Sequence, residues 1–230
     1  MTKFIKTIIY SSLLFLNIIG AINAQNTNKL LIIKTKEAYL KTVQEDEDKA
    51  LVLLKKYVPS IKLDIKYATL QNIFYKKLYP EASAYVRLPV AKALAKVQEE
   101  LKSKGLSLKI YDAYRPYSVT VQMFEMLPDT LYMGLPWTGS KHNKGIALDL
   151  TLVNLKTGKE LKMPTPFDAL VYASHPEFPL VSDEVKQNRE LIKEVMKRHG
   201  FVVDPMEWWH FNYKSSTNFE ILDLPFKTFE

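Results

Sequence analysis

The chain has 230 residues, of which 47% are hydrophobic and 25% charged, and its formal net charge is +7. This composition is typical of a soluble globular protein and excludes fibrous and low-complexity classes. The length accommodates one domain with a substantial core, but not two domains of ordinary size. Basic and acidic residues alternate along 186–198, which indicates a solvated helix face and argues against nucleic-acid binding.

The first 24 residues predict an export signal. Lys3 and Lys6 precede a mostly apolar stretch, Ile8–Ile22, and small residues follow up to Ala24. The stretch is shorter than the roughly 20 apolar residues of a spanning helix, so we expect a signal peptide, residues 1–24, to be removed. The mature protein is then expected outside the cytoplasm, periplasmic or extracellular, without stable membrane insertion.

The chain contains no Cys. An exported chain of this kind has no disulfide framework, so the hydrophobic core, together with any bound metal, must stabilise the fold. Any metal site must therefore use His and carboxylate ligands.

The spacing of apolar residues predicts the order of the elements. The acidic run 45–48 precedes an apolar stretch and is expected at a helix N-terminus, with residues 25–58 peripheral to the domain. Apolar residues alternate along predicted strands at 61–66, 106–110, 146–153 and 201–203. Apolar stripes predict helices at 89–104, 118–127 and 183–199. Between them, 128–141 is predicted to be a long loop, and such loops are often functional.

These elements predict the fold class. Residues 156–158 suit a hairpin turn, and the helices lie between or beside the strands rather than alternating strictly with them. We therefore expect residues 25–230 to form a single α+β domain, with a central, mainly antiparallel sheet flanked by helices.

One loop and strand carry two candidate metal ligands. His142 lies in the loop, and Asp149 lies on the polar face of the next strand together with Ala147, whose small side chain leaves space for an ion. Catalytic zinc takes three ligands from His, Asp or Glu and leaves one position open. An ordinary hydrogen-bonded His–Asp pair is the alternative interpretation.

A second segment supplies a third ligand and a base. His210 can complete the ligand set, and Glu207, three residues earlier, can act as general base towards the water that zinc activates. Alternatively, Glu207–His210, which contains two Trp residues, forms an aromatic core patch with polar edges. The remaining two histidines, His175 and His199, have no comparable neighbours, and His199 is interpreted as a cation at a helix C-terminus.

Three motifs together resemble the D-alanyl-D-alanine dipeptidases. They are Asp-x-Tyr-Arg-Pro at Asp112–Pro116, Ser-x-His-x-x-Gly-x-Ala-x-Asp at Ser140–Asp149, and Glu-Trp-Trp-His at Glu207–His210. The likeness covers about residues 62–213. The zinc ligand set alone is shared with carboxypeptidases, cell-wall endopeptidases and the hedgehog signalling domain, so the resemblance implies the fold of that superfamily.

The resemblance implies roles for the site residues. It implies one zinc ion per chain, bound by His142, Asp149 and His210, with Glu207 as general base. It also implies that Arg115 stabilises the oxyanion, a task that suits a permanently charged guanidinium with several donors.

Four further positions follow from the same resemblance. Asp112 is expected to orient the catalytic arginine, and Tyr67, Ser140 and Asp168 are expected to contact the substrate. A carboxylate such as Asp168 suits a free α-ammonium.

The sequence departs from the family pattern at two places. Pro164 and Pro166 stand in the loop before Asp168, where the family has a more flexible glycine-containing pattern, and Leu70 replaces a Trp. Because Pro fixes φ and removes a donor, the departure bears on how that loop presents Asp168.

The leading hypothesis is therefore a zinc peptidase that hydrolyses D-alanyl-D-alanine or a similar small D,D-dipeptide in peptidoglycan turnover. The nearest alternative is a D,D-carboxypeptidase or endopeptidase on longer peptidoglycan stem peptides. The alternative of another class is a zinc-stabilised binding module without turnover, which would need neither a general base nor an oxyanion donor.

Overall fold

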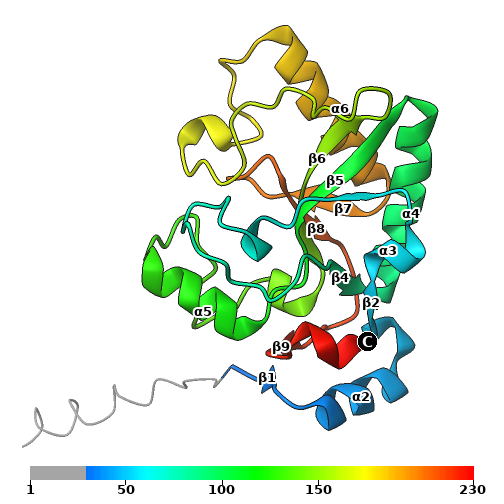
Figure 1. The fold of residues 1–230 in the computed structure, drawn as a ribbon, viewed down its shortest axis with the longest axis vertical. Coiled ribbons are helices and arrows are strands. Elements are labelled where there is room, and N and C mark those ends of the chain that lie inside the picture. The colour runs from blue at the N-terminus through cyan, green and yellow to red at the C-terminus, as the bar shows by residue number, and fades with distance from the viewer. Residues whose placement is uncertain (1–29) are drawn as a thin grey trace, which may run out of the picture. The chain divides into compact units, whose positions relative to one another are not determined.

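A five-stranded sheet organises the part of the chain that the computed structural model describes, residues 30–230 (Figure 1). The strands, in their order across the sheet, are β3 (Lys62–Leu63), β5 (Leu106–Asp112), β6 (Ala147–Asn154), β8 (His210–Tyr213) and β7 (Phe201–Val203). The pair β3–β5 is parallel, and the other three neighbouring pairs are antiparallel. The predicted α+β fold with a mainly antiparallel central sheet is confirmed.

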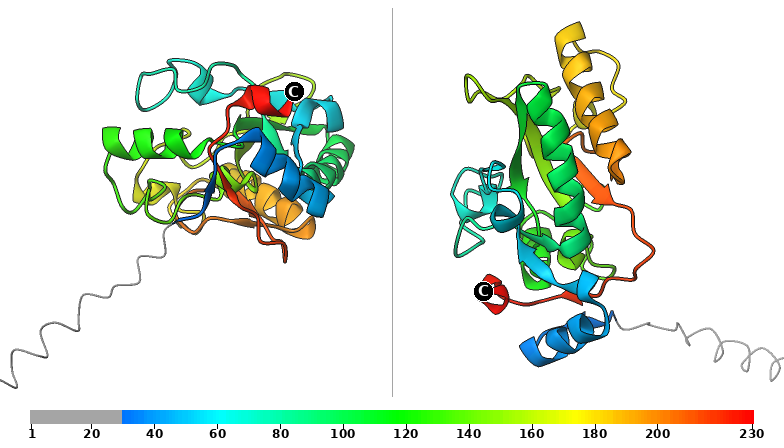
Figure 2. Two further views of the ribbon diagram at one scale, coloured as in Figure 1. Left: turned by 90° about the horizontal axis from the view of Figure 1, so that it is seen from below. Right: turned by 90° about the vertical axis from the view of Figure 1, so that its right-hand side faces the viewer.

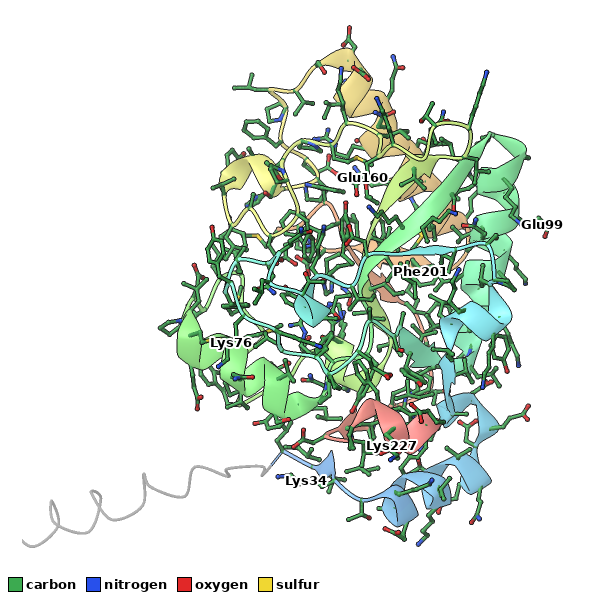
Figure 3. All side chains as sticks on the ribbon, in the orientation of Figure 1. Lys34, Lys76, Glu99, Glu160, Phe201 and Lys227 are labelled. Carbon is green, nitrogen blue, oxygen red and sulfur yellow. The ribbon has the colours of Figure 1, made fainter. Side chains whose placement is uncertain are left out.

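Two long helices cover the apolar face of this sheet. Helices α4 (Leu88–Ser103) and α6 (Asp183–Arg198) pack on the sheet and contact each other (Figure 2). Leu148 and Leu150 of β6 are fully buried in the core that these helices close. On the opposite side of α4, Glu99 points away from the molecule (Figure 3). The helical periodicity seen in the sequence thus places the apolar stripe of α4 against the sheet.

Smaller elements surround the central sheet. Strand β2 (Leu51–Leu53) pairs antiparallel with β4 (Tyr85–Arg87), and β1 (Ile32–Ile33) pairs parallel with β9 (Ile221–Leu222). The remaining helices and turns are α2 (Lys36–Glu45), α3 (Leu54–Tyr57), α5 (Tyr117–Met126), η2 (Glu47–Lys49), η3 (Lys66–Ala68), η4 (His142–Lys144), η5 (Tyr172–Ser174) and η6 (Phe226–Phe229). Residues 31–230 form one compact unit.

The segment around the acidic run differs from the prediction. Glu45 ends α2, and Asp46 accepts a hydrogen bond from the backbone N–H of Asp48 in the short turn η2. The apolar residues that follow form β2 because their backbone groups pair with β4. The apolar stretch is therefore helical only in the short α3, and its predicted peripheral position is wrong, since Leu51 and Leu54 lie in the core.

The first predicted strand is shorter than expected. Only Lys62 and Leu63 pair with β5, and the chain then turns through η3. The alternating apolar residues are nevertheless buried as predicted for a strand, because Ile61 and Ile65 both lie in the core. The turn η3 carries Tyr67, one of the residues expected to contact the substrate.

The predicted signal peptide, residues 1–24, lies outside the described residues. Within residues 30–230, no helix has the length and hydrophobicity needed to cross a membrane.

The central sheet generates a stability prediction. Leu150→Ala removes a fully buried side chain at the sheet–helix interface and should lower the free energy of unfolding by about 2–5 kcal/mol. Leu180→Ala, at a position that is 81% exposed, is the matched control and should change it by less than about 0.5 kcal/mol. Urea unfolding of both variants measures the difference. Equal effects would mean that this face of β6 is not the core.

Candidate active site

The register of the central sheet places three polar residues in one row. Asp149 on β6 lies directly opposite His210 on β8, and a bulge in β5 brings Asp112 opposite Asp149 from the other side. All three project from the sheet face that α4 and α6 do not cover, because residues of one strand alternate between faces. Ala147, on the same face, keeps the space above it open.

His142 reaches this row from the loop before β6. It begins the turn η4, which ends at Gly145 with φ of 72°. A Cβ atom at Gly145 would lie 2.5 Å from a methyl group of Leu51, so both the left-handed backbone and the close packing require glycine there. The buried Arg87 holds the same turn, because its Nε donates to the carbonyl of Lys144 at 2.7 Å.

The ring and carboxylate atoms of His142, Asp149 and His210 form a tight triangle. Nε2 of His142 lies 3.2 Å from Nδ1 of His210, and the Oδ1 atom of Asp149 lies 3.4 Å and 3.1 Å from these two nitrogens. Among the described residues, this is the group of His and acidic side chains whose geometry suits a metal ion. Tetrahedral zinc with bonds of roughly 2.0–2.1 Å sets its ligands about 3.3 Å apart, so the triangle fits zinc.

The hydrogen bonds on the far side of each imidazole support this fit. Nδ1–H of His142 donates to the carbonyl of Ala113 at 2.7 Å, and Nε2–H of His210 donates to Oδ1 of Asn212 at 3.0 Å. Each ring therefore keeps its proton on the nitrogen that faces away from the other ring. The two lone pairs point into the triangle, which is the arrangement that metal-binding histidines use.

Glu207 lies beside the triangle. Its Oε2 atom is 3.7 Å from Nδ1 of His210, and the side chain is only 15% exposed. Burial, together with the nearby carboxylates of Asp149 and Asp168, raises the pKa of Glu207 to about 8, although His210 opposes the shift. The carboxyl group is thus placed to exchange a proton within the cavity.

Arg115 is fixed in direction by Asp112. Its Nε and Nη2 atoms both donate to Oδ2 of Asp112, at 3.0 Å and 2.7 Å. Asp112 is fully buried, and its other oxygen accepts from the hydroxyl of Tyr79 at 2.7 Å. Burial alone would lower the pKa of Arg115, but the Asp112 carboxylate and its neighbours raise it well above the ordinary value. The guanidinium stays charged at the edge of the cavity.

Asp168 also lines the cavity, although two prolines precede it. The hydroxyl of Tyr67 donates to both of its carboxylate oxygens, at 3.2 Å and 3.0 Å. Asp168 has φ of 60°, a conformation that Asp adopts more readily than most residues, and the ring of Phe167 is anchored against Tyr111 and Trp209. Leu70, the second departure from the family pattern, is 64% exposed and does not line the cavity.

Ser140 has a local role that its sequence position did not reveal. Its Oγ accepts from the backbone N–H of His142 at 3.2 Å, and the side chain also lines the cavity. The neighbouring Asn143 is fully buried and donates to the carbonyl of Arg115 at 2.9 Å. Ser140 therefore stabilises the His142 loop internally, and Asn143 ties that loop to the Arg115 turn.

Sequence reasoning missed three supporting residues, namely Tyr79, Asn143 and Asn212. Asn143 directly follows a candidate ligand, and Asn212 lies two residues after another on the same strand face, so their positions gave a usable signal. Tyr79 gave none, because its partner Asp112 lies 33 residues away in the chain.

The cavity around these groups is small and acidic. Its volume is about 250 Å³, below the roughly 300–1,000 Å³ of sites for drug-sized ligands. Eight of the nine predicted site residues line the cavity, and so do the loop residues 131–134; the eight are Tyr67, Arg115, Ser140, His142, Asp149, Asp168, Glu207 and His210. Burial and the Asp149 carboxylate raise the pKa of Asp168 to about 8, which indicates a shortage of positive charge.

The chain was compared with known proteins. A family model described as D-ala-D-ala dipeptidase matches residues 47–229. The D-alanyl-D-alanine dipeptidase of Escherichia coli is 35% identical over 179 residues, covering 78% of this chain and 92% of the relative. The enzyme of the same name from Enterococcus faecium is 28% identical over 182 residues, covering 69% and 88%.

Solved structures show weaker likeness. The vancomycin-resistance D,D-dipeptidase VanXYg, in complex with a D-Ala-D-Ala phosphinate analogue, is 20% identical with a TM-score of 0.35, and the match covers 58% of this chain and 52% of that one. VanYB in complex with D-alanine-D-alanine is 12% identical with a TM-score of 0.40, and the match covers 57% of this chain and 73% of that one.

The sequence matches define a class of hydrolytic enzymes, the peptidases. Within that class, the chain belongs to the D-alanyl-D-alanine dipeptidase family, and the resemblance seen in the sequence is confirmed.

The hydrogen bond from His210 to Asn212 generates a metal-affinity prediction. Asn212→Leu removes the acceptor that orients the His210 ring, and it should weaken zinc binding roughly 10- to 100-fold. Competition with a chromophoric chelator measures the affinity. Asn188→Leu, at a residue whose amide bonds the carbonyl of Lys162 far from the triangle, is the control and should bind zinc normally. Unchanged zinc affinity in the Asn212 variant would show that Asn212 does not support zinc binding by His210.

Proposed function

We propose that this protein is a zinc peptidase that hydrolyses D-alanyl-D-alanine or a similar small D,D-dipeptide, in peptidoglycan turnover. The observation that carries the proposal is the triangle of His142, Asp149 and His210, with Glu207 and Arg115 on two sides of the same cavity. A binding module without turnover would need the triangle alone. Membership of the dipeptidase family supports the same conclusion.

Each group has a chemical task in this proposal. Bound zinc would act as a Lewis acid on the scissile carbonyl and lower the pKa of water towards about 7. Glu207 accepts the proton of the attacking water and passes it to the leaving amine, because its carboxyl group faces the ligand triangle. Arg115, held in direction by Asp112, stabilises the negative charge that develops on the carbonyl oxygen.

The proposed substrate is short and carries a free ammonium group. The buried Asp168 carboxyl group accepts a hydrogen bond from Tyr67 at the cavity wall, and a bound α-ammonium would stabilise its ionised form. The small volume of the cavity favours a dipeptide over a long stem peptide.

The separable roles of base and ligand generate a prediction. Glu207→Gln should retain zinc while kcat for D-Ala-D-Ala falls about 10²- to 10⁴-fold, because the amide cannot accept the proton. His210→Ala should lose both zinc and turnover. Elemental analysis and amine release are measured on the same samples. Wild-type turnover in the Glu207 variant would assign the base to another group.

The pairing of Asp168 with a substrate ammonium generates a second prediction. N-acetylation of D-Ala-D-Ala removes the charge and leaves a buried carboxylate unpaired, which costs about 3–5 kcal/mol. We expect kcat/KM for the acetylated dipeptide to be at least a hundredfold lower than for the free dipeptide. Similar values for the two would favour a carboxypeptidase or endopeptidase on longer stems.

We also propose that the protein is exported and works in the periplasm or outside the cell. The basic start and apolar stretch of residues 1–24 support this, as does the peptidoglycan origin of the proposed substrate. Expression of the full chain in a bacterial host, followed by intact mass measurement of the extracytoplasmic protein, should give a chain that begins at Gln25. A chain that keeps residues 1–24 and stays in the cytoplasm would contradict export.

A further inference from the structure

The loop of residues 128–141 connects α5 to the turn that carries His142, and it forms one wall of the cavity. Its residues 131–134 line the cavity, including Tyr132. The side chain of Tyr132 also contacts the segment 172–178, which contains η5 and His175 and contributes no residue to the cavity lining. Both α5 and the yellow segment around η5 lie to the left of the sheet in Figure 1.

At its α5 end the loop is firmly anchored. The Tyr117 hydroxyl donates to the carbonyl of Pro136 at 2.7 Å. The Oδ1 atom of Asp129 accepts from the backbone N–H groups of Leu131 and Tyr132, at 2.7 Å and 3.1 Å. A Cβ atom at Gly134 would lie 3.0 Å from a methyl group of Thr120, so the loop packs closely on α5. These contacts fix one side of the loop.

On its other side, a single hydrogen bond joins the loop to the segment 172–178. The hydroxyl of Tyr132 lies 3.2 Å from Nε2 of His175, and both side chains are half-buried. Within residues 30–230, no other hydrogen bond links the loop to the segment 172–178. Burial and the carboxylates of Asp129 and Glu207 raise the pKa of Tyr132, so its hydroxyl stays protonated.

His175 is itself held in place. Its ring packs edge-on against Tyr172 at 4.8 Å between centroids, and Tyr172 packs in the same manner against Phe178. The preceding carbonyl, that of Ser174, accepts from the backbone N–H of Trp208 at 2.9 Å, next to Glu207. The partner of Tyr132 is therefore fixed relative to the proposed general base.

We infer that Tyr132 and His175 determine substrate length, by holding the 128–141 loop closed over a cavity that admits a dipeptide and excludes a longer peptide. This inference rests on the proposed function. A dipeptide fits the closed cavity, whereas a longer peptide binds only when the loop is open. The apparent affinity for a longer peptide therefore scales with the fraction of molecules that are open.

Tyr132→Phe tests this inference, because it removes the hydroxyl and keeps the ring. Loss of one such hydrogen bond should raise the open population roughly 2- to 10-fold. We expect the ratio of kcat/KM for D-Ala-D-Ala-D-Ala to kcat/KM for D-Ala-D-Ala to rise by that factor. His175→Phe should act in the same direction.

Tyr172→Phe is the matched control, since it removes a hydroxyl from the same segment at a residue that does not line the cavity. Its ratio of tripeptide to dipeptide hydrolysis should equal that of the wild type. Amide hydrogen exchange in 128–141, measured without substrate, should be faster in Tyr132→Phe and unchanged in Tyr172→Phe.

The outcomes separate this inference from the proposed function. A wild type that hydrolyses D-Ala-D-Ala, with unchanged ratios and exchange rates in Tyr132→Phe and His175→Phe, would overturn the role of the pair and leave the proposed function intact. A wild type that hydrolyses neither peptide would refute the proposed function, and with it the assignment of substrate length.

Discussion

Three atoms with lone pairs face one another at 3.1 to 3.4 Å in the centre of this protein, two of them imidazole nitrogens and one a carboxylate oxygen. Such a group requires positive charge at its centre, and the protons of both rings are already committed to acceptors on their far sides. The rest of the site is arranged around this need. Positive charge would also stabilise the ionised carboxyl groups of Asp168 and Glu207. Burial and neighbouring carboxylates raise the pKa of each to about 8.

The sheet explains how the triangle is maintained. Asp149 and His210 are cross-strand neighbours, and their positions cannot change without shifting the register of β6 against β8. That register is fixed by the buried leucines on the opposite face of β6, so the hydrophobic core and the proposed metal ligands depend on the same alignment. His142 depends instead on the left-handed glycine at position 145 and on the buried Arg87. The site therefore combines two rigid strand positions with one loop position that is fixed by packing.

Much of this arrangement could be predicted from the sequence. Strict alternation along 146–153 placed Asp149 on the face opposite the leucines, and the apolar stripe after Pro89 predicted α4. Local patterns failed where pairing between distant segments decided the structure, as for Leu51–Leu53, which became a strand because Tyr85–Arg87 lies beside it. Two hydrogen bonds join residues that are distant in the chain. Tyr79 and Asp112 are 33 residues apart, and Tyr132 and His175 are 43 residues apart, so no local sequence pattern predicts these bonds.

The central claim is that His142, Asp149 and His210 together hold one zinc ion. X-ray absorption at the zinc edge, on protein purified with its metal, measures the ligands directly. We expect two imidazole nitrogens and oxygen ligands at roughly 2.0–2.2 Å, with one of the two imidazole contributions lost in His142→Ala. A zinc shell without imidazole, or the same shell in wild type and His142→Ala, would contradict it.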